Sequence, residues 1–277
     1  MADTASQQAP AGSPVLREEI LAYYERGKED GRLRTGVGRL ELWRTQDVLR
    51  RLLPEPPATI LDVGGGSGVH AAWLAGDGHR VEVIDPVPLH VEQAAALPGV
   101  TARAGDARAL PVPDGSAEVV LMLGPLYHLT ERRDRVRALA EARRAVRPGG
   151  LVVAATINRF AGLHDSLDNG GYADPGLRAF VDAFSRDGRH SAEGGSFTTA
   201  YFHEPAEVPE EFRAAGLTPT GQYGLEGAAW LMRDAVARPA DGDQRHAVLA
   251  ALRRVESVPS LLGISGHLLT AGTAAAA

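Results

Sequence analysis

Short apolar runs alternate with helical patterns through the middle of the chain. The apolar runs predict strands at residues 60–63, 81–84, 100–104, 119–123 and 151–157, and a helix is predicted over 131–146. Strands that are apolar throughout and separated by helices are typical of a parallel sheet covered on both faces. The pattern therefore predicts an α/β fold with a doubly wound sheet.

The pattern differs at the two ends of the chain. Residues 1–13 are polar and predict a disordered tail. Residues 15–27 and 40–53 are predicted to be helices, and a proline cluster follows the second of them. We therefore expect 14–53 to form a helical cap. A helix at 204–215, a strand at 217–224, a helix at 243–257 and a strand at 267–273 are predicted near the C-terminus. We expect residues 14–277 to form a single domain.

Residues 161–197 interrupt this alternation. They carry many glycines and aspartates with scattered aromatic residues. A surface insertion with its own small core is one interpretation. We favour a substrate lid, because the segment follows the end of a strand, where open α/β sheets bind their ligands.

Composition limits the classes of partner. The 277 residues are 44% hydrophobic with a net charge of -6, and cysteine is absent. The acidic balance argues against a nucleic-acid partner, and no apolar run reaches membrane-spanning length. Without cysteine there are no disulfides or thiolate sites, which fits a reducing cytoplasm. The sequence thus predicts a cytoplasmic protein, monomeric or homodimeric, with no membrane partner.

The most informative stretch is residues 58–68, where an apolar run ends in Asp62 and glycines follow at 64, 66 and 68. A helical pattern comes next. Glycine is needed where the backbone turns tightly or approaches a ligand closely. Alone, this strand, turn and helix are weak evidence, since many nucleotide-binding proteins have them.

Two further acidic residues narrow the class of ligand that the turn could bind. Asp85 closes the second predicted strand, where a carboxylate can accept hydrogen bonds from both hydroxyls of a ribose. That position does not separate one nucleotide cofactor from another. Asp106 follows the third strand and discriminates better, because an acid there can reach an exocyclic amine such as adenine N6.

These motifs resemble those of the class I S-adenosylmethionine-dependent methyltransferases. The resemblance covers about residues 20–275 and rests on Asp62 to Gly68, Asp85, Gly105-Asp106-Ala107 and Arg147 to Gly150. It implies a Rossmann-like sheet of seven strands in the order 3-2-1-4-5-7-6, with the strand at 267–273 antiparallel. It also implies S-adenosyl-L-methionine as the cofactor.

The resemblance implies a role at each matching position. Gly64 and Gly66 would let the backbone pass the methionine part, and Asp62 would hold that turn or reach the cofactor amine through water. Asp85 would bind the ribose, whereas Asp106 and Ala107 would bind the adenine edge. Leu123 would contact the cofactor near its sulfonium.

The predicted cap offers two more candidates for the cofactor. Arg44 could pair with the methionine carboxylate in a charge-assisted contact, or it could be a solvated helix residue. Tyr24 could pack over the cofactor, since a sulfonium favours aromatic faces, or it could fill the core of the cap.

Candidate catalytic residues follow the fourth strand. Methyl transfer from a sulfonium is an in-line displacement, and a base is needed only when the acceptor begins protonated. His128 is the candidate base, with a core histidine bonded to the backbone as the alternative. Tyr127 could orient the acceptor or pack under the cofactor. His203 and Tyr172 are candidates for substrate binding, with helix capping as the alternative for His203.

Oxygen donors at Asp165, Asp168 and Asn169 are better explained as turn residues, so no metal site is predicted. The sequence predicts methyl transfer from S-adenosylmethionine to an O, N or C atom of a small molecule, such as a secondary metabolite. Alternatives are an NAD(P)-dependent oxidoreductase and a non-catalytic protein that binds S-adenosylmethionine, because a fold does not fix a function.

Overall fold

A computed structural model describes residues 38–192, 197–231 and 242–276, together with Glu19, Ile20, Tyr24, Gly31 and Leu33. The predicted tail at 1–13 and most of the helix predicted at 15–27 lie outside the described residues. The division of the chain into tail, cap, domain and lid stays a prediction.

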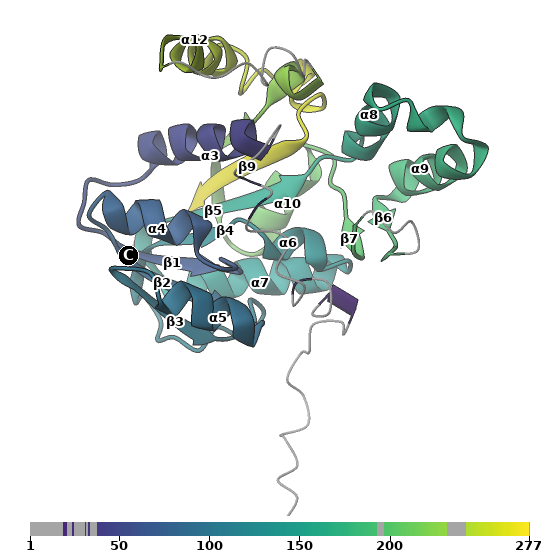
Figure 1. Cartoon of the computed structure of the whole chain (residues 1–277). Helices are drawn as coiled ribbons and strands as arrows, with labels where there is room; N and C mark the ends of the chain where they lie inside the picture. Colours follow the sequence, from purple (N-terminus) through teal and green to yellow (C-terminus); the bar gives the residue numbers. More distant parts are fainter. Residues whose placement is uncertain are drawn as a thin grey trace, which may run out of the picture.

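The centre of the molecule is a seven-stranded sheet in the order β3-β2-β1-β4-β5-β9-β8 (Figure 1). Its strands are β1 (Thr59–Val63), β2 (Arg80–Asp85), β3 (Val100–Ala104), β4 (Ala117–Met122), β5 (Val146–Ile157), β8 (Thr218–Gly224) and β9 (His267–Thr273). Strand β9 runs antiparallel to both β5 and β8, whereas the pairs from β3 to β5 are parallel. Since β8 and β9 are the sixth and seventh strands of this sheet in chain order, the predicted order and the antiparallel last strand are confirmed.

Successive strand residues point to opposite faces of the sheet, so neighbouring apolar residues of one strand make both faces apolar. Ile60 and Val119 pack in one cluster with α3 (Gly38–Leu52), α4 (Val69–Gly76) and α5 (Pro88–Ala95). Their neighbours Leu61 and Val120 pack in a second cluster with α7 (Arg132–Ala145) and α10 (Glu207–Ala214). Helices on both faces are what the continuous apolar strands predicted.

The remaining described elements lie outside the seven-stranded sheet. They are α6 (Pro125–His128), α8 (Ala161–Asp168), η1 (Gly171–Ala173), α9 (Pro175–Asp187), β6 (Arg189–His190), β7 (Ala200–Tyr201), η3 (Gly227–Leu231), α12 (Gly242–Arg253) and α13 (Pro259–Leu262). Strand β5 begins at Val146, earlier than predicted, because Val146 pairs with Ala117 before the Pro-Gly-Gly turn. No described helix is long and apolar enough to span a membrane.

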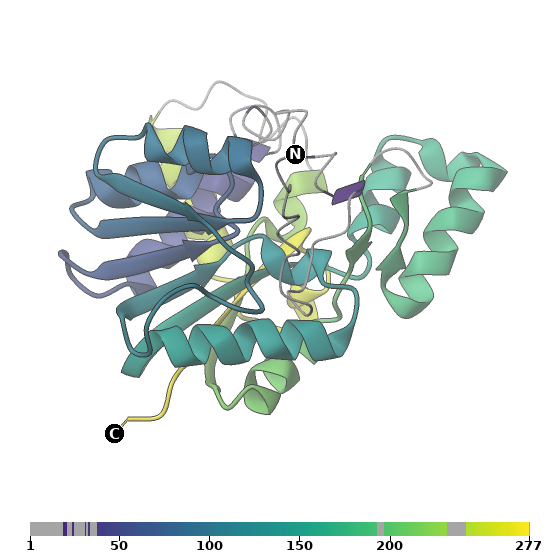
Figure 2. The same ribbon diagram turned by 90° about the horizontal axis from the view of Figure 1, so that it is seen from below.

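The insertion after β5 is more regular than its glycines suggested. Helices α8 and α9 stand apart from the seven-stranded sheet in both views (Figures 1 and 2). Phe184 of α9 is 3% exposed and centres a separate apolar cluster with Val181, Phe202 and Ile157. Ile157, the last residue of β5, joins this cluster to the sheet.

Candidate active site

A pocket opens where β1, β2, β3 and β4 end. Most of the predicted cofactor and catalytic residues line it, namely Tyr24, Asp62, Gly64, Gly66, Asp85, Asp106, Ala107, Leu123, Tyr127 and His128. The carboxyl ends of parallel strands meet at one edge of a sheet, so residues far apart in sequence meet here. Arg44, His203 and Tyr172 are not among the lining residues.

The glycine-rich turn forms the floor of the pocket. Gly64 has φ +67° and Gly66 has φ +58°, a backbone conformation that L side chains rarely adopt. A Cβ at Gly64 would also lie 2.9 Å from Cδ of Pro125. The Gly64 amide donates to the Ile84 carbonyl at 2.7 Å, which fixes the turn against the end of β2.

Asp85 organises the next part of the wall. One carboxylate oxygen accepts from the Gly66 amide at 2.9 Å, and the other accepts from the Val87 amide at 2.9 Å and lies 3.1 Å from Nδ1 of His90. The structure shows that protein groups already satisfy part of the hydrogen-bonding capacity of Asp85, and a carboxylate can accept more than these bonds.

Asp62 is the unusual group of this pocket. It is 0% exposed, and neither carboxylate oxygen has a hydrogen-bond partner in the described part of the chain. Burial raises the pKa of its carboxyl to about 7, and the nearby charge of Asp85 adds to the rise. An unpaired buried carboxylate is costly, so this site favours a cationic partner.

Asp106 is held by its neighbour Arg108. The Arg108 guanidinium donates to both carboxylate oxygens, at 2.9 and 2.7 Å, and the Arg108 amide donates to one of them at 2.8 Å. This grip fixes the carboxylate beside Ala107 at the pocket wall. Acceptor capacity remains for a ligand amine, since each oxygen has two lone pairs.

Aromatic side chains also line the pocket. The Tyr24 hydroxyl lies 2.6 Å from Nε2 of His128, and the Tyr24 ring meets the rings of His90 and His128 edge-on. Tyr127 stacks edge-on against His128, at 4.6 Å between ring centroids. Burial lowers the pKa of His128 to about 4, so its imidazole is neutral at pH 7.

The charge of the pocket is negative. Its carboxylates come from Glu41, Asp62, Asp85 and Asp106, and none of the described lining residues is lysine or arginine. Such a wall suits a ligand with positive charge and disfavours a pyrophosphate.

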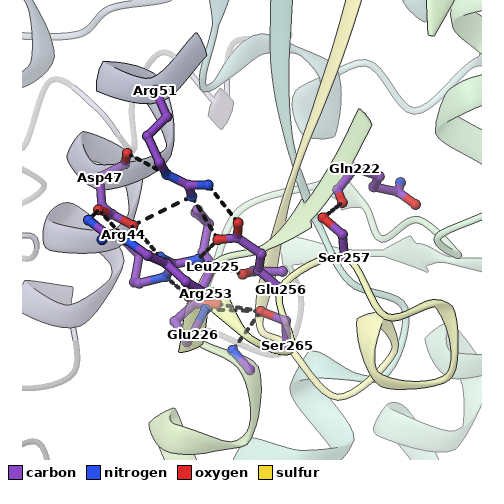
Figure 3. Close-up of polar contacts among 12 residues, drawn as sticks. Arg44, Asp47, Arg51, Gln222, Leu225, Glu226, Arg253, Glu256, Ser257 and Ser265 are labelled. Carbon is purple, nitrogen blue, oxygen red and sulfur yellow. Dashed lines mark hydrogen bonds and ion pairs between the residues drawn. The ribbon is translucent and has the colours of Figure 1, made fainter. Parts of the chain in front are cut away.

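The structure gives Arg44 a place different from the predicted one. Its guanidinium is fully buried and pairs with Asp47 and Glu256, each at 2.5 Å, and it donates to the Leu225 carbonyl at 2.8 Å (Figure 3). Arg44 is therefore not a solvated helix residue, and its guanidinium pairs with carboxylates of the protein and not, as we had expected, with a cofactor carboxylate. Arg44 instead ties α3 to the segment after β8.

His203 and Tyr172 also lie away from the pocket. His203 is 0% exposed, with Nε2 3.5 Å from Glu211, and burial lowers its pKa. The Tyr172 hydroxyl donates to Asp182 at 2.6 Å within the insertion. Tyr172 thus has a partner within the insertion, whereas neither ring nitrogen of His203 has a hydrogen-bond partner among the described residues. Neither residue lines the pocket.

Sequence reasoning missed His90 and Glu41, which both line the pocket. A signal for His90 was present, because Pro88 begins α5 and a residue in the first turn of that helix faces back toward Asp85. Glu41 gave no local signal, since its place depends on how α3 packs against the sheet.

Comparison with known proteins agrees with this geometry. Residues 60–150 match a family described as a methyltransferase domain. A tRNA U34 carboxymethyltransferase of Shewanella denitrificans is 34% identical over 122 residues, 42% of this chain and 36% of that protein. A ubiquinone/menaquinone biosynthesis C-methyltransferase of Acidiphilium cryptum is 32% identical over 168 residues, 54% of this chain and 65% of that protein. The chain thus spans less than two thirds of the length of either relative.

A solved structure shares the fold. The 1,6-didemethyltoxoflavin-N1-methyltransferase of Burkholderia thailandensis, with 1,6-didemethyltoxoflavin and S-adenosylhomocysteine bound, has a TM-score of 0.56 at 18% identity, covering 97% of this chain and 93% of that chain. The segment that matches the family model runs from β1 into β5 and contains most of the pocket wall. Residues 60–150 therefore match a methyltransferase domain, and the sheet has the strand order implied by the resemblance to class I S-adenosylmethionine-dependent methyltransferases.

Proposed function

We propose that this protein transfers the methyl group of S-adenosylmethionine to an O, N or C atom of a small molecule, such as a secondary metabolite. The observation that carries the proposal is Asp62, a buried carboxylate without a partner among the described residues, in the wall of a negatively charged pocket. A cofactor with an ammonium and a sulfonium supplies the missing positive charge. The match of residues 60–150 to a methyltransferase domain and the negative wall of the pocket together favour methyl transfer over the oxidoreductase alternative.

The residues present fit this cofactor. Asp62 would attract its amine, Asp85 would accept from the ribose hydroxyls, and Asp106 with Ala107 would meet the adenine edge. The glycine turn at 64 and 66 leaves room for close approach of the methionine part. When bound, the cofactor supplies an electrophilic methyl group.

The chain's own residues contribute position more than proton transfer. A neutral His128 adds no positive charge beside a cation, and its bond with Tyr24 fixes both rings. With a pKa of about 4, His128 is a weak base at neutral pH. We infer that Tyr127, His128 and Leu123 mainly shape the space where the acceptor meets the methyl group.

The insertion is proposed as the lid of the acceptor site. Phe197, at its end, lies 6.5 Å from the Tyr127 ring and 6.0 Å from the His128 ring, between centroids. Phe184→Ala would loosen the separate apolar cluster under the lid. We expect cofactor affinity to stay unchanged while acceptor turnover falls at least about tenfold; equal turnover in variant and parent would remove the lid from the mechanism.

The acceptor class is tested by following the methyl group. The purified full-length protein is incubated with S-adenosylmethionine labelled in the methyl group, with a panel of small phenols, amines and enols in one arm and total tRNA in the other. We expect label in a small molecule together with formation of S-adenosylhomocysteine. Label in tRNA would contradict the small-molecule acceptor, and the absence of methyl transfer in both arms would favour the non-catalytic binding protein. A cytoplasmic location is likewise proposed, from the absence of cysteine.

The cofactor site is tested by calorimetry. Asp85→Ala is expected to weaken S-adenosylmethionine binding by at least about tenfold, equal to about 1.4 kcal/mol. Glu92→Ala is the matched control, because Glu92 is an exposed carboxylate on the neighbouring α5 and does not line the pocket. Undetectable binding of the parent protein at about 1 mM cofactor, a binding free energy of about -4 kcal/mol, would overturn the proposed function.

A further inference from the structure

Three metal-ligating side chains meet at the carboxyl edge of the sheet. Glu41 comes from the first turn of α3, Glu226 follows β8, and His267 is the first residue of β9. One ligand atom from each lies within 4.8 Å of the others. Nδ1 of His267 is 2.6 Å from a Glu226 oxygen and 3.8 Å from a Glu41 oxygen.

Glu226 is held firmly in this cluster. It is 2% exposed, and one oxygen accepts from the His267 amide at 2.9 Å and lies 2.9 Å from the Ser265 hydroxyl. Figure 3 shows Glu226 and Ser265 side by side, next to the cluster around Arg44. A buried carboxylate fixed by main-chain and hydroxyl groups is positioned before any ligand arrives, which lowers the cost of binding.

We propose that Glu41, Glu226 and His267 bind a divalent first-row cation. Carboxylate oxygens suit Mn²⁺ and imidazole suits the first-row transition metals, so the mixed set selects an ion that accepts both. Two ligands at right angles, each about 2.1 Å from one ion, lie about 3 Å apart. The observed separations of 2.6 and 3.8 Å bracket that value, so small side-chain movements complete the site.

The proposed cation site borders the pocket. Glu41 lines the pocket as well as the cluster, so an ion bound there lies at the pocket rim. Three protein ligands leave coordination positions for water or for oxygens of a bound molecule. The site goes beyond the proposed methyl transfer and does not depend on it. Without an ion, the same contacts would only tie α3 to the start of β9.

The test is direct metal binding without cofactor. The full-length protein is stripped with a chelator and titrated with MnCl₂, with free Mn²⁺ followed by electron paramagnetic resonance and heat followed by calorimetry. We expect one Mn²⁺ per chain with micromolar affinity, about -8 kcal/mol. Glu41→Gln and His267→Ala should each weaken binding by at least about tenfold.

Two controls keep the outcome readable. Glu210→Gln changes an exposed carboxylate on α10, outside the cluster, and should bind Mn²⁺ like the parent. Glu226→Gln changes a buried group and can unfold the protein, so Glu41→Gln, at a partly exposed position, is the decisive variant and its melting temperature is measured alongside. No saturable binding below about 1 mM Mn²⁺, or equal binding by the parent, Glu41→Gln and His267→Ala, would overturn the proposal.

Discussion

At the scale of single residues, Asp62 is the carboxyl group of the pocket whose pKa the fold shifts strongly. Its pKa of about 7 lies above the 3.8 of an ordinary aspartate because burial disfavours the charged form. A folded-state pKa that is raised means that stability is lost as pH rises from about 4 to about 7. A bound cation would reverse this, since it favours the ionised carboxylate.

Asp62→Asn is therefore expected to change three measurements. Urea unfolding at pH 8 should show a gain of about 4 kcal/mol in stability without cofactor, and no gain at pH 4. Affinity for S-adenosylmethionine should fall at least about tenfold. Calorimetry at pH 7 in buffers of different ionisation enthalpy should show about half a proton less released on binding.

Because the cofactor's own amine exchanges protons, only the difference between parent and variant reports Asp62. A variant that keeps both its affinity and its proton release would show that Asp62 does not meet the cofactor. Asn adds a neutral amide of similar shape, so loss of fold is a smaller risk than with Ala.

At the scale of elements, α3 is fixed to the C-terminal part of the chain by charges. Arg44 joins Asp47 to Glu256, and Arg51 and Arg253 add further pairs to the same two carboxylates. The sequence shows an amphipathic helix with arginines on it and nothing about their partners. Glu256 lies 212 positions away, so only packing could assign this cluster.

Arg44→Met tests that assignment. Removing one partner from a buried ion pair leaves uncompensated charge, so we expect a loss of about 3 kcal/mol in unfolding free energy. Affinity of the folded protein for S-adenosylmethionine should stay unchanged, because Arg44 is absent from the pocket wall. The opposite pair of results, full stability with weakened cofactor binding, would return Arg44 to the cofactor.

The β-α alternation and the elements of the sheet could be predicted from local pattern. Strand β4 and residues 151–157 of β5 are largely apolar runs, whereas β2 and β3 mix apolar with polar residues. Most of the pocket residues follow the strand ends directly. The structure of the insertion was harder to predict, because its glycines and aspartates suggested loops. Two helices form there because Phe184 and its neighbours bury a core that no short window shows.

At the scale of the whole molecule, three histidines with lowered pKa values oppose Asp62 in their effect on stability. Burial lowers the pKa of His128 to about 4 and lowers those of His190 and His203 as well. The unfolded chain then takes up protons below about pH 6.5 that the folded protein excludes. Stability from these groups is complete above about pH 6.5 and is lost as pH falls toward 4.

In the Asp62→Asn background the histidine effect should no longer be opposed by Asp62. Unfolding free energy, measured by urea at several pH values, is expected to fall steadily on acidification, with His128 alone contributing about 3 kcal/mol by pH 4. His128→Gln should flatten part of the slope, whereas His246→Gln, at an exposed position of α12, should leave it unchanged. A slope independent of His128 would contradict its burial as a neutral group.

The sequence by itself determined the sheet, its order through the family resemblance, and the residues that follow each strand end. These depend on hydrophobic period and on turns that need glycine, which are local properties of the chain. The tertiary structure decided which charges pair. It left Asp62 without a described partner, gave Asp85 the partner His90, moved Arg44 out of the pocket and brought Glu41, Glu226 and His267 together. Such pairings join residues distant in sequence, and their energies depend on burial, which only the packed fold sets.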